Sequence, residues 1–238
     1  MNDARDFHYV GNELALFAGA ENWKAYWGRK ISPYLGNTVL DVGAGLGATA
    51  KLLCGPKQKR WLALEPDSQL SAAMCESKRS GHLPATCEIR TGTLADVHED
   101  EKFDTILYVD VLEHIQNHAE ELANAEKHLE NNGCIIVLSP AHQRLFTPFD
   151  SALGHFRRYD KNSIRSATPA SLALDRYFYL DCAGLLATLG NKLFLQSASP
   201  NPSQIWFWDR VLVPVSRVAD PVFRFSLGKS IVAIWRRK

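Results

Sequence analysis

Three glycines at alternate positions, Gly43, Gly45 and Gly47, suggest chemistry more directly than any other part of this 238-residue chain. The preceding residues, TVLDV, are β-branched or aliphatic and predict a buried strand over 38–42, and a helix is predicted over 48–54. Because glycine has no Cβ, the backbone can turn tightly there and a ligand can lie against it. A glycine-rich turn between a strand and a helix N-terminus is typical of a site for a nucleotide-like cofactor.

The acidic residue before the glycines indicates which cofactor this is. Gly43, Gly45 and Ala48 fit the dinucleotide pattern G-x-G-x-x-G/A. Read as a whole, DVGAGLG instead places Asp41 at the strand end, ahead of G-x-G-x-G. A carboxylate there would repel a pyrophosphate but attract a cofactor with an ammonium and a sulfonium group. Asp41 therefore favours S-adenosylmethionine over a nicotinamide dinucleotide, and a tight turn that binds nothing is the other alternative.

The end of the second predicted strand offers contacts to a ribose. This strand, Arg60–Glu65, ends in a carboxylate about 20 residues past the glycines, where an acid can reach a ribose diol in this topology. Pro66 and Asp67 follow it. Asp67 or Ser68 is expected to cap the next helix, and contact with the ribose or adenine is the alternative role.

The turn after the third predicted strand, 86–90, is a candidate for the adenine. Gly92, Thr93 and Leu94 form a small loop that could enclose the base, with Leu94 on its face and Thr93 at its edge. Asp96 is a second candidate for the adenine amino group. Taken alone, this pattern predicts only a turn.

Histidines after the fourth and fifth predicted strands are candidates for proton transfer, because imidazole titrates near neutrality. His114 lies in DVLEHI, which follows the strand predicted at 104–109. His142 and His155 lie in a long polar loop, 139–164, and long loops at the active end of a sheet are often functional. The alternative role of each histidine is to support the local structure by hydrogen bonding.

Arginines in the same loop have two interpretations. Arg157 and Arg158 could hold an anionic acceptor, or they could anchor the loop to Asp150 or Asp160, and we favour the anchor. No cluster of residues has metal-ligand spacing along the sequence, so we expect a reaction without a metal ion.

The elements that must position these residues alternate between strands and helices. Strands are predicted at 38–42, 60–65, 86–90, 104–109, 134–138, 172–180 and 230–235. This alternation predicts a doubly wound α/β fold with a mostly parallel sheet and helices on both faces. The carboxyl ends of the strands, which carry Asp41, Glu65, Gly92, Asp110 and Ser139, should then meet at one edge.

We expect one domain, 1–238, in four parts. These are an N-terminal helical lid at 1–35, a cofactor-binding core at 36–180, a helical cap insertion at 181–227 and a closing strand at 228–238. In the first part, Tyr9, Trp23 or Tyr26 could close over the site, or a helix there could simply pack against the sheet, with Gly19 as a break.

The insertion predicts two helices. Leu185, Leu189, Leu193 and Phe194 suggest the first, and 204–218 suggests a second helix that is kinked at Pro214. Arginines recur every seven residues at 210, 217 and 224, beside several aromatic residues. Over 204–225 this pattern fits a packed helix, a cap on an acceptor pocket, a homodimer surface or a peripheral membrane contact.

The composition is that of an ordinary globular protein, with 46% hydrophobic and 22% charged residues. A formal net charge of +1 gives no electrostatic case for a nucleic-acid partner. Five scattered cysteines indicate a reducing compartment rather than a disulfide or zinc framework. The first ten residues lack the pattern of a signal peptide, so we expect a cytoplasmic protein.

The chain resembles the class I, Rossmann-like S-adenosylmethionine-dependent methyltransferases. The resemblance rests on VLDVGAGLG, Glu65 and DVLEHI, runs from about Gly36 to Ser139 and resumes near Ile231. It is similar to the branch that modifies quinones and other small molecules. The resemblance implies a seven-stranded sheet whose last strand is antiparallel to its neighbours.

The resemblance also implies roles for residues of the site. Asp41, Gly43, Ala44, Gly45 and Gly47 would hold the methionine end of the cofactor. Glu65, with Pro66 and Asp67, would bind the ribose, and Gly92, Thr93 and Leu94 would flank the adenine. Tyr108, Val109 and Asp110 would border the sulfonium. His114 is the histidine that the family motif places near the methyl group.

The reaction implied is in-line methyl transfer to a small, hydrophobic or aromatic acceptor, with S-adenosylhomocysteine as product. Alignment of the reactants can supply on the order of 7–11 kcal/mol, and a base is needed only if the acceptor must lose a proton. A non-catalytic S-adenosylmethionine-binding regulatory or scaffolding subunit and an NAD-dependent oxidoreductase are the alternatives.

Overall fold

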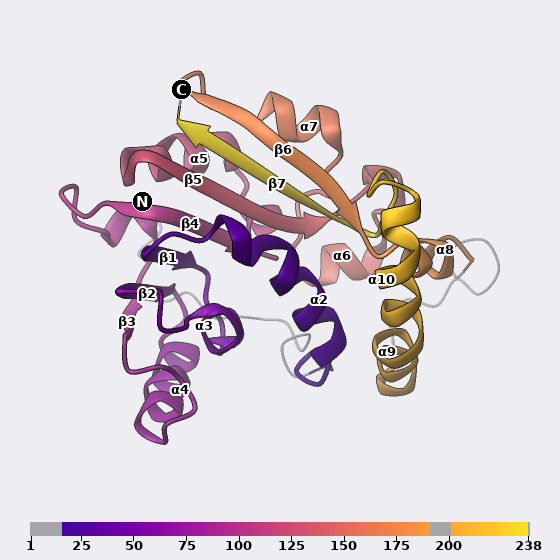
Figure 1. The fold of residues 1–238 in the computed structure, drawn as a ribbon, viewed down its shortest axis with the longest axis horizontal. Coiled ribbons are helices and arrows are strands. Elements are labelled where there is room, and N and C mark those ends of the chain that lie inside the picture. Colours follow the sequence, from indigo (N-terminus) through magenta and orange to yellow (C-terminus); the bar gives the residue numbers. More distant parts are fainter. Residues whose placement is uncertain (1–15, 191–200, 238) are drawn as a thin grey trace.

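The computed structural model describes residues 16–190 and 201–237, and its centre is a seven-stranded sheet (Figure 1). The strands are β1 (Thr38–Val42), β2 (Arg60–Glu65), β3 (Cys87–Thr91), β4 (Phe103–Val109), β5 (Leu129–Pro140), β6 (Leu172–Leu180) and β7 (Ser230–Arg237). Their order is β3-β2-β1-β4-β5-β7-β6. Neighbours from β3 to β5 pair in parallel, whereas β7 is antiparallel to both β5 and β6. The predicted fold class is confirmed.

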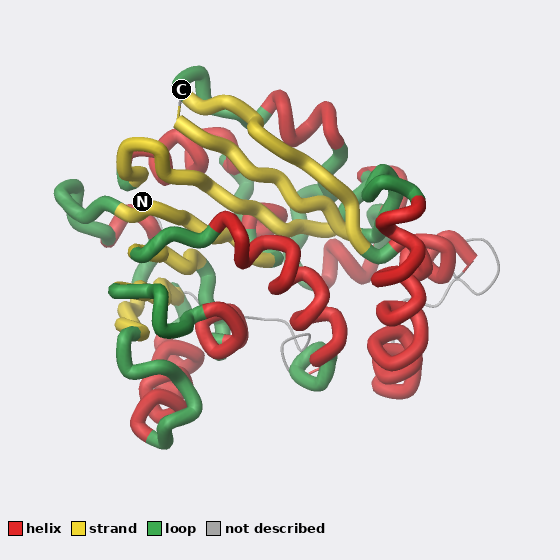
Figure 2. Tube along the Cα trace, viewed as in Figure 1, coloured by secondary structure: helices red, strands yellow, loops and turns green. Residues whose placement is uncertain are grey.

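Helices connect the strands and cover the sheet (Figure 2). The α-helices are α2 (Glu21–Ile31), α3 (Ala48–Leu53), α4 (Ser68–Arg79), α5 (His118–Lys127), α6 (Pro148–Ala152), α7 (Lys161–Ser166), α8 (Cys182–Gly190), α9 (Pro202–Phe207) and α10 (Val213–Val222). Short 3₁₀ turns are η2 (Ser32–Tyr34), η3 (Leu94–Asp96), η4 (Leu112–His114) and η5 (Gln143–Leu145). A π-helical segment, η7 (Trp208–Leu212), joins α9 to α10.

Two hydrophobic clusters form the core, one on each face of the sheet, because side chains alternate along a strand. In β5, Ile136 and Leu138 belong to the cluster that also contains Trp23 and Trp27 of α2. Ile135 and Val137 belong to the opposite cluster, together with residues of α5 and α7. Both faces of the central strands are therefore buried, and polar groups of the chain collect at the strand ends.

The strand order reverses between β1 and β4, since β1 continues to β2 on one side while β4 continues to β5 on the other. In open α/β sheets, ligands bind at such a switch point, outside the carboxyl ends of the strands. The glycine turn follows β1 and the DVLEHI stretch follows β4, so the fold brings these two segments together.

Most predicted boundaries agree with the structure. The first, second and sixth strands have the predicted bounds, whereas the third is Cys87–Thr91, one residue later. The fifth strand is longer than predicted because regular pairing resumes on either side of Asn132, which has a positive φ. Tyr9, Leu193 and Phe194 lie outside the described residues.

The predicted helix at 204–218 contains a change of helix type. The chain passes from α9 through the π-helical η7 into α10, and Pro214 lies in the first turn of α10. Proline is tolerated in a first turn because its missing N–H is not needed there. The described helices include none that is both long and apolar enough to cross a membrane.

Buried acids join α2 to the helices of 181–227. The backbone N–H of Trp23 donates to Asp209 Oδ1 at 2.9 Å, and the Tyr26 hydroxyl donates to Asp220 Oδ2 at 2.7 Å. Trp23 also lies against Trp208, with ring centroids 5.7 Å apart. In the described part of 1–35, Trp23 and Tyr26 are thus buried in a packed helix.

Candidate active site

The glycine turn after β1 has the backbone that its sequence predicts. Gly43, Gly45 and Gly47 have φ values of 68°, 58° and 78°, which side chains rarely allow. A Cβ on Gly43 would also stand 2.6 Å from Val111 Cγ2, so only glycine permits the close packing of this turn against the segment after β4. Ala44, between the first two glycines, is buried.

Glu65 ties this turn to the end of β2. One carboxylate oxygen accepts from Gly45 N at 2.7 Å and the other accepts from Asp67 N at 2.9 Å. Asp67 in turn accepts from the N–H groups of Gln69 and Leu70, so it is the N-cap of α4 as expected. A carboxylate oxygen has two acceptor positions, so Glu65 can still accept a hydrogen bond from a ligand hydroxyl.

Burial raises the pKa values of two carboxyl groups in the site, which reduces its negative charge. Asp41 is buried and accepts a hydrogen bond from Trp61 Nε1 at 3.3 Å. Burial, with a further contribution from the Glu65 carboxylate, raises the pKa of Asp41 to about 7. Burial also raises the pKa of Glu65. A cationic ligand would favour the ionised form of both groups.

The adenine candidates form a small capped turn. Gly92 has a φ of 147°, and its N–H donates to the carbonyl of Glu65, which places this turn beside β2. Thr93 and Asp96 form a capping box, so both are engaged with each other. Leu94 is buried in the hydrophobic cluster on the α5 face, which leaves Thr93 more accessible than Leu94.

Three residues were expected to border the sulfonium, and they lie at the end of β4 or directly after it. Their surroundings differ. Tyr108 is fully buried on the α5 face and its hydroxyl donates to Glu121 at 2.9 Å, whereas Val109 packs against the opposite cluster. Asp110 has a φ of 54° and is accessible to solvent. Partial loss of solvent around the carboxyl group raises its pKa to about 6, against the opposing effects of His155 and Lys229.

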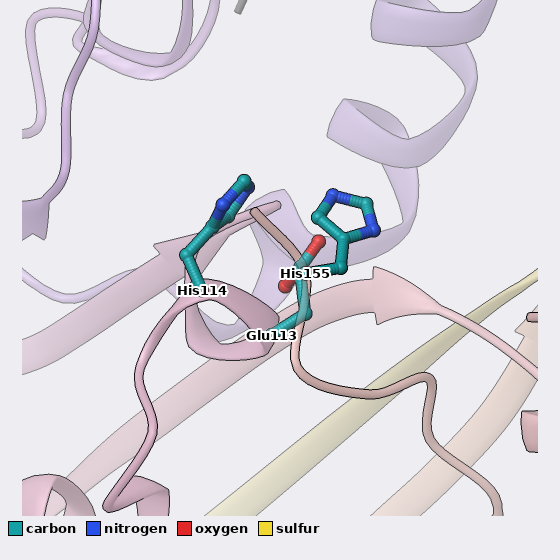
Figure 3. A group of neighbouring side chains, drawn as sticks. All are labelled: Glu113, His114 and His155. Atoms are coloured by element: carbon teal, nitrogen blue, oxygen red, sulfur yellow. The ribbon is translucent and has the colours of Figure 1, made fainter. Parts of the chain in front are cut away.

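Glu113, His114 and His155 come together beside Asp110 (Figure 3). The two rings lie edge to face with centroids 4.6 Å apart. Burial, and to a lesser degree His155, lowers the pKa of His114 to about 4, so its imidazole is neutral at physiological pH. Glu113 is buried, and burial together with the Asp110 charge raises its pKa well above the usual range.

One oxygen of Glu113 accepts from Ser139 Oγ at 2.7 Å, and the other has no hydrogen-bond partner. One ligand atom from each of Glu113, His114 and His155 can be chosen so that all lie within 4.8 Å of one another. Such a donor set could hold a metal ion or the polar end of an acceptor. Sequence spacing could not reveal this group, because His155 lies on a separate loop.

A buried ion pair holds His155 in place. Asp150 accepts from His155 Nδ1 at 3.1 Å, and Arg158 donates to both oxygens of Asp150, at 2.7 and 2.9 Å. These donors hold the pKa of Asp150 well below its usual range despite burial. The anchor that we predicted from the sequence is thus present between Arg158 and Asp150. Arg157 instead donates to the carbonyls of Ile115 and Gln116.

His142 is engaged elsewhere. Its Nε2 donates to the carbonyl of Gly228 at 2.9 Å, and its ring stacks on Tyr179 with centroids 5.2 Å apart. His142 therefore joins the loop after β5 to the start of β7, apart from the pair formed by His114 and His155.

Sequence reasoning missed Lys229, which lies between the site and the helices of 181–227. Its ammonium lies 4.4 Å from the ring centroid of Trp208, and burial lowers its pKa while the charges of Asp181 and Asp110 oppose this. A single lysine ahead of the last strand carries no signal in the sequence that could have identified it.

Comparisons with known proteins agree with this fold. The protein-family model described as "Methyltransferase domain" matches residues 17–170. No curated protein sequence matches the chain. Solved structures that are similar include a putative sarcosine dimethylglycine methyltransferase from Galdieria sulphuraria, with a TM-score of 0.60 and 17% identity over 92% of this chain and 85% of that chain.

Two further similar structures differ in their named activities. Coclaurine N-methyltransferase, bound to N-methylheliamine and SAH, has a TM-score of 0.63 and 13% identity over 92% of this chain and 72% of that one. The [4+2]-cyclase SpnF has a TM-score of 0.61 and 13% identity over 96% and 94% of the two chains. At these identities, the likeness shows a shared fold.

The strand order and the family match identify the class of this protein, which is that of the class I, S-adenosylmethionine-dependent methyltransferases. The chain belongs to the methyltransferase-domain family, since the family match covers well over half of its length.

Proposed function

We propose that this methyltransferase methylates an oxygen or nitrogen of a small acceptor that has an apolar or aromatic part, and that His155 receives the acceptor's proton. S-adenosylmethionine would supply a methyl group on a sulfonium, with S-adenosylhomocysteine as the leaving group once the acceptor's electron pair had bonded to the methyl carbon. The proton lost by the acceptor would pass to His155.

The acidic and glycine-rich lining supports the cofactor assignment. Asp41, Glu65 and Asp67 surround a turn whose glycines leave room for a ligand against the backbone. Three carboxylates favour a cofactor that carries positive charge, and they would repel the pyrophosphate of a nicotinamide dinucleotide. In this arrangement Gly43, Ala44, Gly45 and Gly47 hold the methionine end, Glu65 binds the ribose, and Gly92 and Thr93 border the adenine.

The hydrogen bond between His155 and Asp150 is the observation that carries the proposed role of His155. Because the Asp150 carboxylate accepts from Nδ1, the proton of neutral His155 stays on Nδ1 and Nε2 is left as a proton acceptor. A carboxylate that fixes the tautomer of a histidine is the arrangement that general bases require. His114 lies edge to face with this ring and can position the acceptor.

An exposed aromatic ring supports an apolar or aromatic acceptor. Phe156, next to His155, is half-exposed, although its backbone N–H is fixed by the carbonyl of Glu113 at 2.9 Å. An exposed phenyl ring that follows His155 directly in the chain could stack on an aromatic or apolar ligand. The Asp110 carboxylate, with a pKa of about 6, is ionised at neutral pH and makes an anionic acceptor unfavourable.

Calorimetric titration with S-adenosylmethionine, S-adenosylhomocysteine and NADH tests the cofactor site. We expect binding of both sulfur compounds and not of NADH. Glu65→Ala should weaken that binding about 10- to 100-fold, because hydrogen bonds to a charged group contribute about 1.5–3 kcal/mol each.

Glu76→Ala, at an exposed position on α4, serves as the matched control and should bind like the wild type. Circular dichroism of Glu65→Ala separates loss of the ribose contact from loss of the fold. Binding of NADH alone would make the protein an oxidoreductase. Cofactor binding without turnover of any small acceptor would favour a regulatory subunit.

A further inference from the structure

Most of the exposed large hydrophobic side chains of the described chain lie in one segment. Ten of the thirteen belong to the helices after β6 or to the turn that follows them, and we call these ten the cap face: Leu186, Leu189, Trp206, Phe207, Val211, Val215, Val218, Val222, Phe223 and Leu227. Val218 and Val222 are 74% and 76% exposed, and Trp206 is 62% exposed. Exposed apolar patches of this kind usually mark an interaction site.

The members of the cap face that belong to α10 lie together on one side of that helix. Val215, Val218 and Val222 are three and four residues apart, which places them on one side of α10. They line a shallow hollow together with Pro214, Ala219 and Phe223, and its walls are almost entirely carbon. A surface helix normally exposes polar side chains to solvent, whereas this side of α10 exposes valines.

The exposed charged residues in the described part of the segment that carries the cap face are all basic. In the described part of 182–227 the acids are Asp209 and Asp220, and both are buried. The bases are Arg210, Arg217 and Arg224, which are all at least partly exposed. Among the residues that the structure describes, only Arg210 of these three has an acid within 4.0 Å on another element, the exposed Glu21. Arg217 adjoins Val218 in the chain and Arg224 adjoins Phe223, so the charged side chains next to these exposed apolar residues are basic.

The buried acids also make this surface rigid. Asp181 accepts from the Trp208 indole N–H and from Ser216 Oγ, both at 2.7 Å. Asp220 accepts from the backbone N–H groups of Asp181 and Cys182 at 2.8 and 3.0 Å. The exposed side chains are therefore the outer face of a firmly packed unit, at the end of the molecule where α8, α9 and α10 gather (Figure 1).

We propose that the cap face docks on an anionic membrane surface. An apolar helical face with arginines beside it in the chain, and with aromatic residues among the exposed apolar side chains, has the features of a helix that lies in the membrane interface. Lipid phosphates match the arginines, which have few acidic partners within the protein. A symmetric pair of copies docked through this face would offer these arginines no exposed acid from the described part of 182–227, so they would gain no opposite charge there.

Vesicle co-sedimentation of the full chain tests this proposal, and its readout does not depend on methyl transfer. We expect binding to vesicles of phosphatidylcholine with about one third phosphatidylglycerol, loss of that binding in high salt, and little binding to pure phosphatidylcholine. Arg217→Glu combined with Arg224→Glu should weaken binding at least 25-fold, since each basic residue near such a surface contributes about fivefold. Val218→Asp combined with Val222→Asp should abolish it.

Lys57→Glu, at an exposed position near β2, is the matched charge control and should bind as the wild type does. Each variant should still bind S-adenosylhomocysteine, which shows that the core remains folded. Failure of the wild type to bind anionic vesicles would overturn the proposal, and so would equal binding by the valine variant. Light scattering that finds a dimer disrupted by the valine variant, without vesicle binding, would assign the face to a second copy.

Discussion

His114 and His155 face each other at the site, but their rings are held in different ways. His155 is fixed by a carboxylate, Asp150, which is itself bound by Arg158. His114 instead has a hydrogen bond with the backbone of Leu153, and burial lowers its pKa to about 4. A base with such a low pKa binds a proton weakly. We therefore favour His155, which the Asp150 carboxylate orients, over His114 as the proton acceptor.

His155→Ala should therefore lower kcat about 10²- to 10⁴-fold for an acceptor that must lose a proton, with little change in cofactor affinity. His114→Ala should mainly raise KM for the acceptor. His82→Ala, at an exposed position, is the control and should leave both constants unchanged. Steady-state kinetics with saturating S-adenosylmethionine measures these effects. Equal loss of kcat in both site variants would contradict the assignment.

The pH profile checks the same assignment. Because the folded-state pKa of His114 lies near 4, its imidazole stays neutral as pH falls from 8 to 6, and activity lost in that range belongs to another group. A chelator should leave kcat unchanged if the imidazoles act directly. Loss of activity on chelation that a divalent ion restores would make Glu113, His114 and His155 metal ligands.

At the scale of elements, the loop between β5 and β6 owes its shape to α6 and the residues around it. Thr147 and Asp150 form a capping box at the start of α6, and the same carboxylate binds Arg158 and His155. One buried acid thus caps a helix, anchors the loop and orients a functional histidine. The site depends on this element as much as on the sheet.

We expect Asp150→Asn to destabilise the protein by about 3–5 kcal/mol, because it leaves the charge of Arg158 buried without its partner. Asp96→Asn disrupts a comparable capping box that is exposed and lacks an arginine, and it should cost about 1 kcal/mol. Urea denaturation at pH 7 measures both values.

The effect of Asp150 should also depend on pH. Its pKa is depressed in the folded state, so its stabilisation is complete above the unfolded value near 3.9 and declines as pH falls below it. The difference between wild type and Asp150→Asn should therefore shrink in acid. A difference that stays constant down to pH 2 would show that packing, and not the ion pair, causes the loss.

The sequence predicts the parts of this fold that rest on local patterns. Gly43, Gly45 and Gly47 have positive φ, and Glu65 ends a run of apolar residues, so the glycine turn and the acid could both be placed without coordinates. The contact between His155 and His114 could not be predicted, because an irregular loop has no periodicity to fix where its side chains lie. The burial of Leu94 was missed for a similar reason, since a turn pattern does not say which side chain faces the core.

At the scale of the whole molecule, the helices of 181–227 are part of the same folded unit as the cofactor-binding sheet. Tyr26 and Trp23 of α2 are bound to Asp220 and Asp209, while α2 also packs on the sheet. His142 is bound to Gly228 at the junction with β7. A rigid connection of this kind would carry the orientation of a docked cap face to the active site.

Native-state hydrogen exchange should show that the helices of 181–227 and the sheet unfold as one unit. We expect amides of α10 and of β1 to exchange with similar free energies, and S-adenosylhomocysteine at about 100 times its Kd should raise both by about 2.7 kcal/mol. Asp220→Asn, which weakens the acceptor for Tyr26 and for two backbone N–H groups, should lower protection of α10 more than that of β1. A lower exchange free energy for α10 than for β1 in the wild type, unchanged by S-adenosylhomocysteine, would show that the helices of 181–227 unfold separately. Docking of the cap face could then not orient the active site.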